Sequence, residues 1–136
     1  MRRRLSAVCR GQKGQSLLET PFMFIVIFMV VFWVYELGWL MYTYSVLADA
    51  AYEGVRHAVV HTGGDASGTQ NTVKTFATAS LHNVTAVAVS VTFPDGNASP
   101  PNRVRVMVTY TYVPYLPAYI TAPTMRTYAE GRMVVE

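Results

Sequence analysis

The chain has 136 residues, a length that suits one domain; 51% of the residues are hydrophobic and only 14% are charged. Average soluble proteins carry roughly 25% charged residues, so this sequence holds more apolar surface than a small core would bury. The net charge is +3, but five of the eleven basic residues lie in the first fourteen positions, and the remainder has more acidic than basic side chains. The composition therefore predicts a membrane span and argues against nucleic acid as a partner.

A long uncharged segment follows the basic tract. No formal charge occurs from Thr20 to Tyr35, and after Glu36 none occurs in residues 37–48. On a helix that rises about 1.5 Å per residue, Glu19 and Glu36 would be roughly 25 Å apart, slightly less than the ~30 Å hydrocarbon core of a bilayer. This pattern predicts one transmembrane helix in contact with membrane lipid.

Aromatic residues mark the predicted outer end of this helix. Trp33 and Trp39 flank Glu36, and such rings favour the boundary between lipid and water. We therefore expect Glu36, Trp33 and Trp39 at the membrane interface.

The positive charges set the predicted orientation. Five of them precede the uncharged segment and none follows it until Arg56, so the positive-inside tendency places the N-terminus in the cytoplasm. We expect a single-pass inner (cytoplasmic) membrane protein with its C-terminal domain outside. A cleaved secretory signal is the alternative, because Ala48-Asp49-Ala50 has the small residues of such a site, but its apolar stretch is normally much shorter.

The end of the basic tract resembles a prepilin cleavage site. In the run Lys13-Gly14-Gln15-Ser16-Leu17-Leu18-Glu19, a carboxylate lies five residues beyond a glycine. The resemblance implies cleavage between Gly14 and Gln15 by a prepilin peptidase. Gly11 is the weaker candidate, because Ser16 lies five residues after it.

Further matching residues lie along the same segment, namely Glu36-Leu37-Gly38, Tyr42, Tyr44, Ala50 to Arg56, and Ala58. With the leader, they make residues 11–61 similar to the TadE-like family of tight-adherence, or Flp-type, pilus systems. The resemblance implies a minor pilin or pseudopilin that packs through residues 17–50 against other pilins, pseudopilins or pilus assembly proteins, and that enters the pilus or remains in the membrane. The alternative is an unprocessed, signal-anchored envelope protein whose exported domain binds a ligand or a partner protein.

The resemblance gives the two glutamates separate roles. Glu19 would meet the N-terminal amine of a neighbouring subunit as an assembly contact, although a negative charge also suits the first turn of a helix. The family often has an arginine where this chain has Trp39. Without it, Glu36 must reach interfacial water, pair with another subunit or become protonated, and we expect it to reach water.

The remaining residues predict a small α+β domain. Ser67 and Gln70 form a possible capping box before a short helix over 72–82. Alternating apolar residues predict strands over 87–93 and 104–112, joined as an antiparallel hairpin, and a third strand over 125–135 with a bulge at Gly131. The predicted fold is thus a membrane-anchored α+β chain with a long N-terminal helix, one short helix and a three- to four-stranded antiparallel sheet. Its predicted parts are a leader (1–14), a transmembrane and extended helix (15–61) and an exported domain (62–136).

The sequence contains no recognisable catalytic motif. Cys9 is the single cysteine, and no paired carboxylates or Ser-His-Asp arrangement occurs at a recognisable spacing. His57 and His61 share one helix face but lack an evident third ligand. We therefore expect neither an enzyme nor a cofactor nor a metal site.

Overall fold

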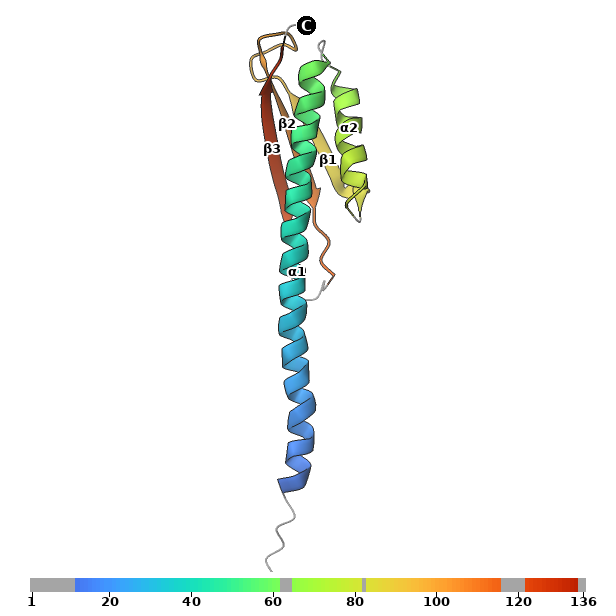
Figure 1. Ribbon diagram of the computed structural model, residues 1–136, viewed down its shortest axis with the longest axis vertical. Coiled ribbons are helices and arrows are strands. Elements are labelled where there is room, and N and C mark those ends of the chain that lie inside the picture. The colour runs from blue at the N-terminus through green and yellow to red at the C-terminus, as the bar shows by residue number, and fades with distance from the viewer. Residues whose placement is uncertain (1–11, 62–64, 82, 116–121, 135–136) are drawn as a thin grey trace, which may run out of the picture. The chain divides into compact units, whose positions relative to one another are not determined.

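The structure, a computed structural model, describes residues 12–61, 65–81, 83–115 and 122–134 (Figure 1). It forms two compact units, one ending at Tyr35 and one beginning at Glu36. The predicted basic leader lies largely outside the described residues, since the first helix begins at Gln12. Residues 12–14 belong to the first turn of that helix.

The N-terminal unit is the first part of helix α1, which runs from Gln12 to Val60. Every side chain from Leu18 to Tyr35 is exposed. Apolar residues surround this part of the helix on all sides, which is the pattern of a helix covered by lipid or by other helices. Within the described residues, α1 is the one helix long and apolar enough to be a candidate membrane span.

The C-terminal unit combines the rest of α1 with a second helix and a sheet. Helix α2 spans Ala66–Thr78, and a short 3-10 turn, η1, spans Val84–Ala86. Strands β1 (Val87–Thr92), β2 (Arg103–Thr111) and β3 (Thr124–Arg132) form an antiparallel sheet in the order β1-β2-β3. The predicted fold class is therefore confirmed, with three strands and one short second helix.

One face of the sheet forms the core. Val104, Val106 and Val108 are fully buried on the central strand β2, as the predicted alternation requires. Helix α2 and the second part of α1 cover this face (Figure 1). From α1, Leu47, Ala50 and other residues at helical spacing join the core.

The start of α2 differs from its prediction. The helix begins at Ala66, earlier than expected, and its cap is Asp65 and not Ser67. The Asp65 carboxylate accepts hydrogen bonds from the Gly68 N–H at 2.8 Å and from the Ser67 hydroxyl at 2.9 Å, and these two bonds lower the pKa of Asp65. An aspartate satisfies the free amides of a first turn directly, so Ser67 supports the cap from inside the helix.

Two glycines of the C-terminal unit allow close packing. A Cβ atom at Gly54 would lie 2.4 Å from Val73 Cγ2 and 3.1 Å from Val106 Cγ1, so α1 needs a glycine to approach α2 and β2. A Cβ at Gly131 would lie 2.5 Å from Val55 Cγ1. The predicted bulge at Gly131 was wrong, because β3 pairs with β2 in unbroken register there; the glycine makes room for α1 instead.

The turn between β1 and β2 is held by an ion pair. Arg103 donates to the Asp95 carboxylate from its backbone N–H at 2.8 Å and from its guanidinium at 2.9 and 3.2 Å. These bonds lower the pKa of Asp95 to about 2. The predicted hairpin is confirmed, because β1 and β2 pair in antiparallel orientation.

Candidate functional site

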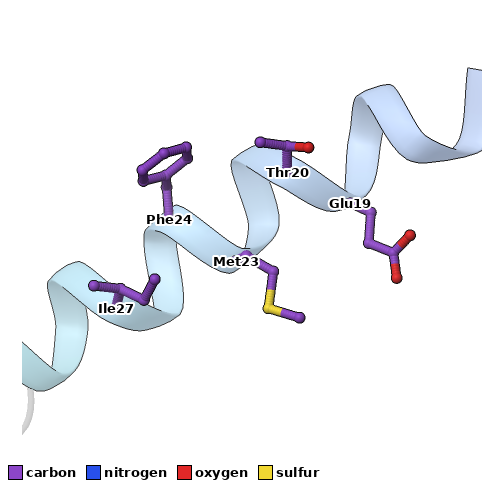
Figure 2. Close-up of a pocket in the computed structure, with 5 residues that line it drawn as sticks. All are labelled: Glu19, Thr20, Met23, Phe24 and Ile27. Carbon is purple, nitrogen blue, oxygen red and sulfur yellow. The ribbon is translucent and has the colours of Figure 1, made fainter.

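Glu19 lies on the exposed N-terminal part of α1. It lines a surface groove with Thr20, Met23, Phe24 and Ile27, as Figure 2 shows. The carboxylate and Met23 point to one side in this view, while Phe24 and Ile27 extend from the other. Glu19 is the one acidic residue among the described residues before Glu36. The groove thus presents a carboxylate beside apolar side chains.

Glu36 is buried, and this contradicts the expectation that it reaches interfacial water. The residue is 2% exposed. Its Oε1 accepts a hydrogen bond from the Tyr112 hydroxyl at 2.6 Å, and the Tyr115 N–H lies 3.3 Å from both carboxyl oxygens. The partners that the carboxyl group needs therefore come from its own chain, from the segment that follows β2.

The tyrosine of this pair is equally enclosed. Tyr112 is 1% exposed, and burial, followed by its hydrogen bond to Glu36, raises the pKa of its hydroxyl far above the ordinary value. The hydroxyl therefore stays protonated at any physiological pH and remains a donor to Glu36. This bond ties the end of β2 to α1.

The two tryptophans have different surroundings. Trp33 belongs to the N-terminal unit and is 44% exposed. Trp39 is half-buried in the C-terminal unit, with its ring 5.4 Å from that of Tyr42 and 6.0 Å, edge to face, from that of Tyr115. The interface role predicted for both tryptophans stays a prediction.

The predicted cleavage site lies at the beginning of α1. Gly14 and Gln15 have helical backbone in the structure, so a peptidase that needs an extended chain must unwind this turn. The cleavage itself stays a prediction.

The histidine pair forms a stack. The rings of His57 and His61 are 4.0 Å apart, and His57 Nδ1 lies 3.2 Å from Thr69 Oγ1. No group of three metal-ligating side chains gathers in the described ranges.

Sequence reasoning missed the Glu36 site because its partner lies far along the chain. Tyr112 is 76 residues away, and its own strand pattern indicates only that it is buried. The sequence did indicate that Glu36 needs another polar partner, since Trp39 stands where the family often has an arginine. Choosing that partner among the tyrosines required the packing of the sheet on α1.

The described residues comprise an exposed apolar helical segment and a small α+β unit. Residues 14–56 match the family model described as TadE-like protein. The resemblance inferred from the sequence is thereby confirmed over this segment. No curated protein and no solved structure matched the chain.

Proposed function

We propose that the protein is a pilin-like component, a minor pilin or pseudopilin, of a tight-adherence pilus or its assembly machinery. The match of residues 14–56 to the TadE-like family model supports involvement in the assembly of such a pilus. The observation that carries the finer proposal is the exposed, uncharged helix surface from Thr20 to Tyr35, with the carboxylate of Glu19 at its start. So much apolar surface requires a cover of lipid or of other helices.

The same helix offers a second exposed surface to a neighbouring helix after Tyr35. Leu37, Met41, Tyr44 and Tyr52 are each at least 50% exposed on the side of α1 that faces away from the sheet. Together with Ala48 they repeat at intervals of three and four residues, the spacing at which two helices interlock side chains. The protein would act through this packing with other pilins or assembly proteins.

Anchoring follows from the same surface. We place α1 across the inner membrane, with the basic residues 1–14 in the cytoplasm and the sheet outside. This topology gives a peptidase at the cytoplasmic face access to Gly14, and it leaves the α+β unit free to meet partners. The family match begins at residue 14, which supports this boundary for the leader.

Maturation predicts a new N-terminus. In cells that contain a prepilin peptidase, mass spectrometry of the purified protein should find Gln15 as the first residue. A Gly14→Leu change should abolish cleavage, because the bulky side chain blocks the approach of the peptidase, whereas Gly11→Leu is the matched control and should be processed normally. An intact Met1 terminus in the wild-type protein would overturn the proposal in favour of an unprocessed, signal-anchored envelope protein.

Substitution of Glu19 should impair assembly with other pilins but not insertion into the membrane. Glu19→Ala should leave the protein in the membrane fraction and reduce its co-purification with other pilins about tenfold or more, because one pairing of a carboxylate with an amine in lipid is lost. Leu18→Ala in the same helical turn is the control and should keep most of the co-purification. Equal recovery of partners by the Glu19→Ala and wild-type proteins would show that Glu19 merely complements the helix dipole.

A further inference from the structure

The outer face of the sheet concentrates positive charge. Val104, Val106 and Val108 are buried in the core, so the residues that alternate with them lie on the opposite face. Five of the eleven lysine and arginine residues belong to the first fourteen positions, and four of the other six lie on this outer face. They are Arg103 and Arg105 of β2 and Arg126 and Arg132 of β3; together with Tyr128, we call them the arginine face.

The charge of the arginine face is only partly balanced. Arg103 pairs with Asp95 at 2.9 Å, and its side chain remains 50% exposed. Arg105 pairs with Glu130 and remains 42% exposed. The two arginines of β3 are exposed and form no ion pair within the described residues. Four guanidinium groups against two carboxylates leave an excess of two positive charges.

Two of these arginines are direct neighbours across the strands. In the register of β2 with β3, Arg103 lies opposite Arg132, and like charges in such a position repel each other. Hydrogen bonds from Arg103 lower the pKa of Asp95 to about 2, and the charge of Arg132 adds to this effect. One carboxylate therefore serves two guanidinium groups, and an anion from outside the chain would offset the remaining repulsion.

Protection of a sheet edge explains only part of this pattern. Charged side chains on an edge strand discourage pairing with other chains, and β3 is an edge strand of the sheet. Strand β2 is central, so the same reason does not apply to Arg103 and Arg105. The arginine face therefore has the composition of an anion-binding surface.

Tyr128 adds an aromatic ring to this surface. It is largely exposed, and the guanidinium carbon of Arg105 lies 5.5 Å from the centre of its ring. An exposed ring offers an apolar surface with a polar hydroxyl at its end, which suits the mixed apolar and polar faces of a sugar. An arginine fork beside it suits a carboxylate, which it binds through two parallel hydrogen bonds.

The neighbouring residues favour a glycan over a nucleic acid. Proteins hold single-stranded nucleic acids by stacking successive bases on several aromatic side chains. Among the outward positions of the three described strands, Tyr128 is the one aromatic residue. Hydroxyl groups that can bond to sugar hydroxyls lie on the same face, from Thr109, Thr111 and Thr124.

We propose that the arginine face binds an acidic polysaccharide, whose carboxylates meet Arg126 and Arg132 and whose sugar rings lie against Tyr128. The two arginines are six residues apart on one strand, which is about 20 Å, so a polymer and not a single sugar reaches both. The site belongs to the C-terminal unit alone. It therefore goes beyond the proposed function and depends neither on maturation nor on pilus assembly.

Binding of polygalacturonate tests the proposal. The full chain is purified in detergent micelles, and its affinity for the immobilised polymer is measured at about 0.15 M salt, where distant charges are screened. Every protein in the comparison carries the same leader, in which the basic residues are removed so that they do not bind the polymer. These changes are Arg2→Gln, Arg3→Gln, Arg4→Gln, Arg10→Gln and Lys13→Gln.

Arg126→Gln combined with Arg132→Gln should weaken binding about tenfold or more, because two charge-assisted contacts are lost. Arg56→Gln combined with Lys74→Gln is the matched control. It removes the same charge from exposed positions on α1 and α2, and it should change the affinity less than about twofold. Near-ultraviolet circular dichroism of both double variants checks that the fold is kept.

Two further comparisons separate the glycan from a general attraction of charges. Tyr128→Ala keeps every charge and should weaken binding about threefold or more, because the ring contact is lost. Fully methyl-esterified polygalacturonate has the same backbone without the carboxylates, and it should not bind.

Three results would overturn the proposal: no binding of polygalacturonate to the parent protein, equal weakening by the two double variants, or equal binding of the methyl ester. Tighter binding of oligo(dT) than of polygalacturonate would assign the face to nucleic acid instead.

Discussion

Replacing Tyr112 with phenylalanine should lower the free energy of unfolding by about 2 kcal/mol. The change removes the hydroxyl that donates to Glu36 Oε1 at 2.6 Å and leaves a carboxyl group that is 2% exposed with only the longer approach of the Tyr115 N–H. A buried polar group without its partner keeps the full cost of leaving water. Denaturation of the full chain in detergent micelles, followed by near-ultraviolet circular dichroism, measures the loss.

A double-mutant cycle separates this bond from general packing. Glu36→Leu alone should also destabilise the protein, because it strands the Tyr112 hydroxyl, yet Glu36→Leu combined with Tyr112→Phe should cost less than the sum of the single changes. Tyr128→Phe is the control, since Tyr128 is 64% exposed on β3, and it should change stability by less than about 0.5 kcal/mol. Strictly additive losses from Glu36→Leu and Tyr112→Phe would contradict a direct bond.

Much of the fold could be predicted because its signals are local. The alternation of valines from Val104 to Val108 defines the central strand, and each of these residues is fully buried. The uncharged run before Glu36 likewise defines the exposed part of α1. In such segments the side-chain period and the burial pattern are two expressions of the same geometry.

The incorrect predictions concern residues whose contacts come from distant segments of the chain. The role of Gly131 depends on Val55 and Val59 of α1, which no pattern within β3 can reveal. The environment of Glu36 depends in the same way on Tyr112 and Tyr115. Burying a glutamate of an apolar segment costs free energy, and only the packing of the folded chain shows which hydrogen bonds offset that cost.

The enclosure of Glu36 also separates two surfaces on one helix. The face of α1 that carries Glu36, Leu47 and Gly54 belongs to the core of the C-terminal unit, whereas Met41 and Tyr52 are exposed away from it. Sequence alone assigns both sets to one apolar segment. The structure shows that the first set is buried, whereas the second set is exposed.

Gly54→Ala should destabilise the protein by about 1–3 kcal/mol, although alanine ordinarily favours a helix over glycine by about 1 kcal/mol. The new methyl group would overlap Val73 Cγ2 at 2.4 Å and press on Val106 Cγ1, and both valines are fully buried.

Gly38→Ala is the matched control on the same helix, because a Cβ there meets no atom within 4 Å, and it should leave stability unchanged or raise it by up to about 1 kcal/mol. Denaturation of the two full-length variants in the same micelles should therefore show a loss of stability for Gly54→Ala and none for Gly38→Ala. Adding Val73→Ala to Gly54→Ala should cost less than the two single changes together, because each change relieves the defect of the other. A stabilising Gly54→Ala would show that α1 does not pack against α2 and β2 at this distance, and the glycine of the Glu53-Gly54-Val55-Arg56 run would then need another explanation than close packing.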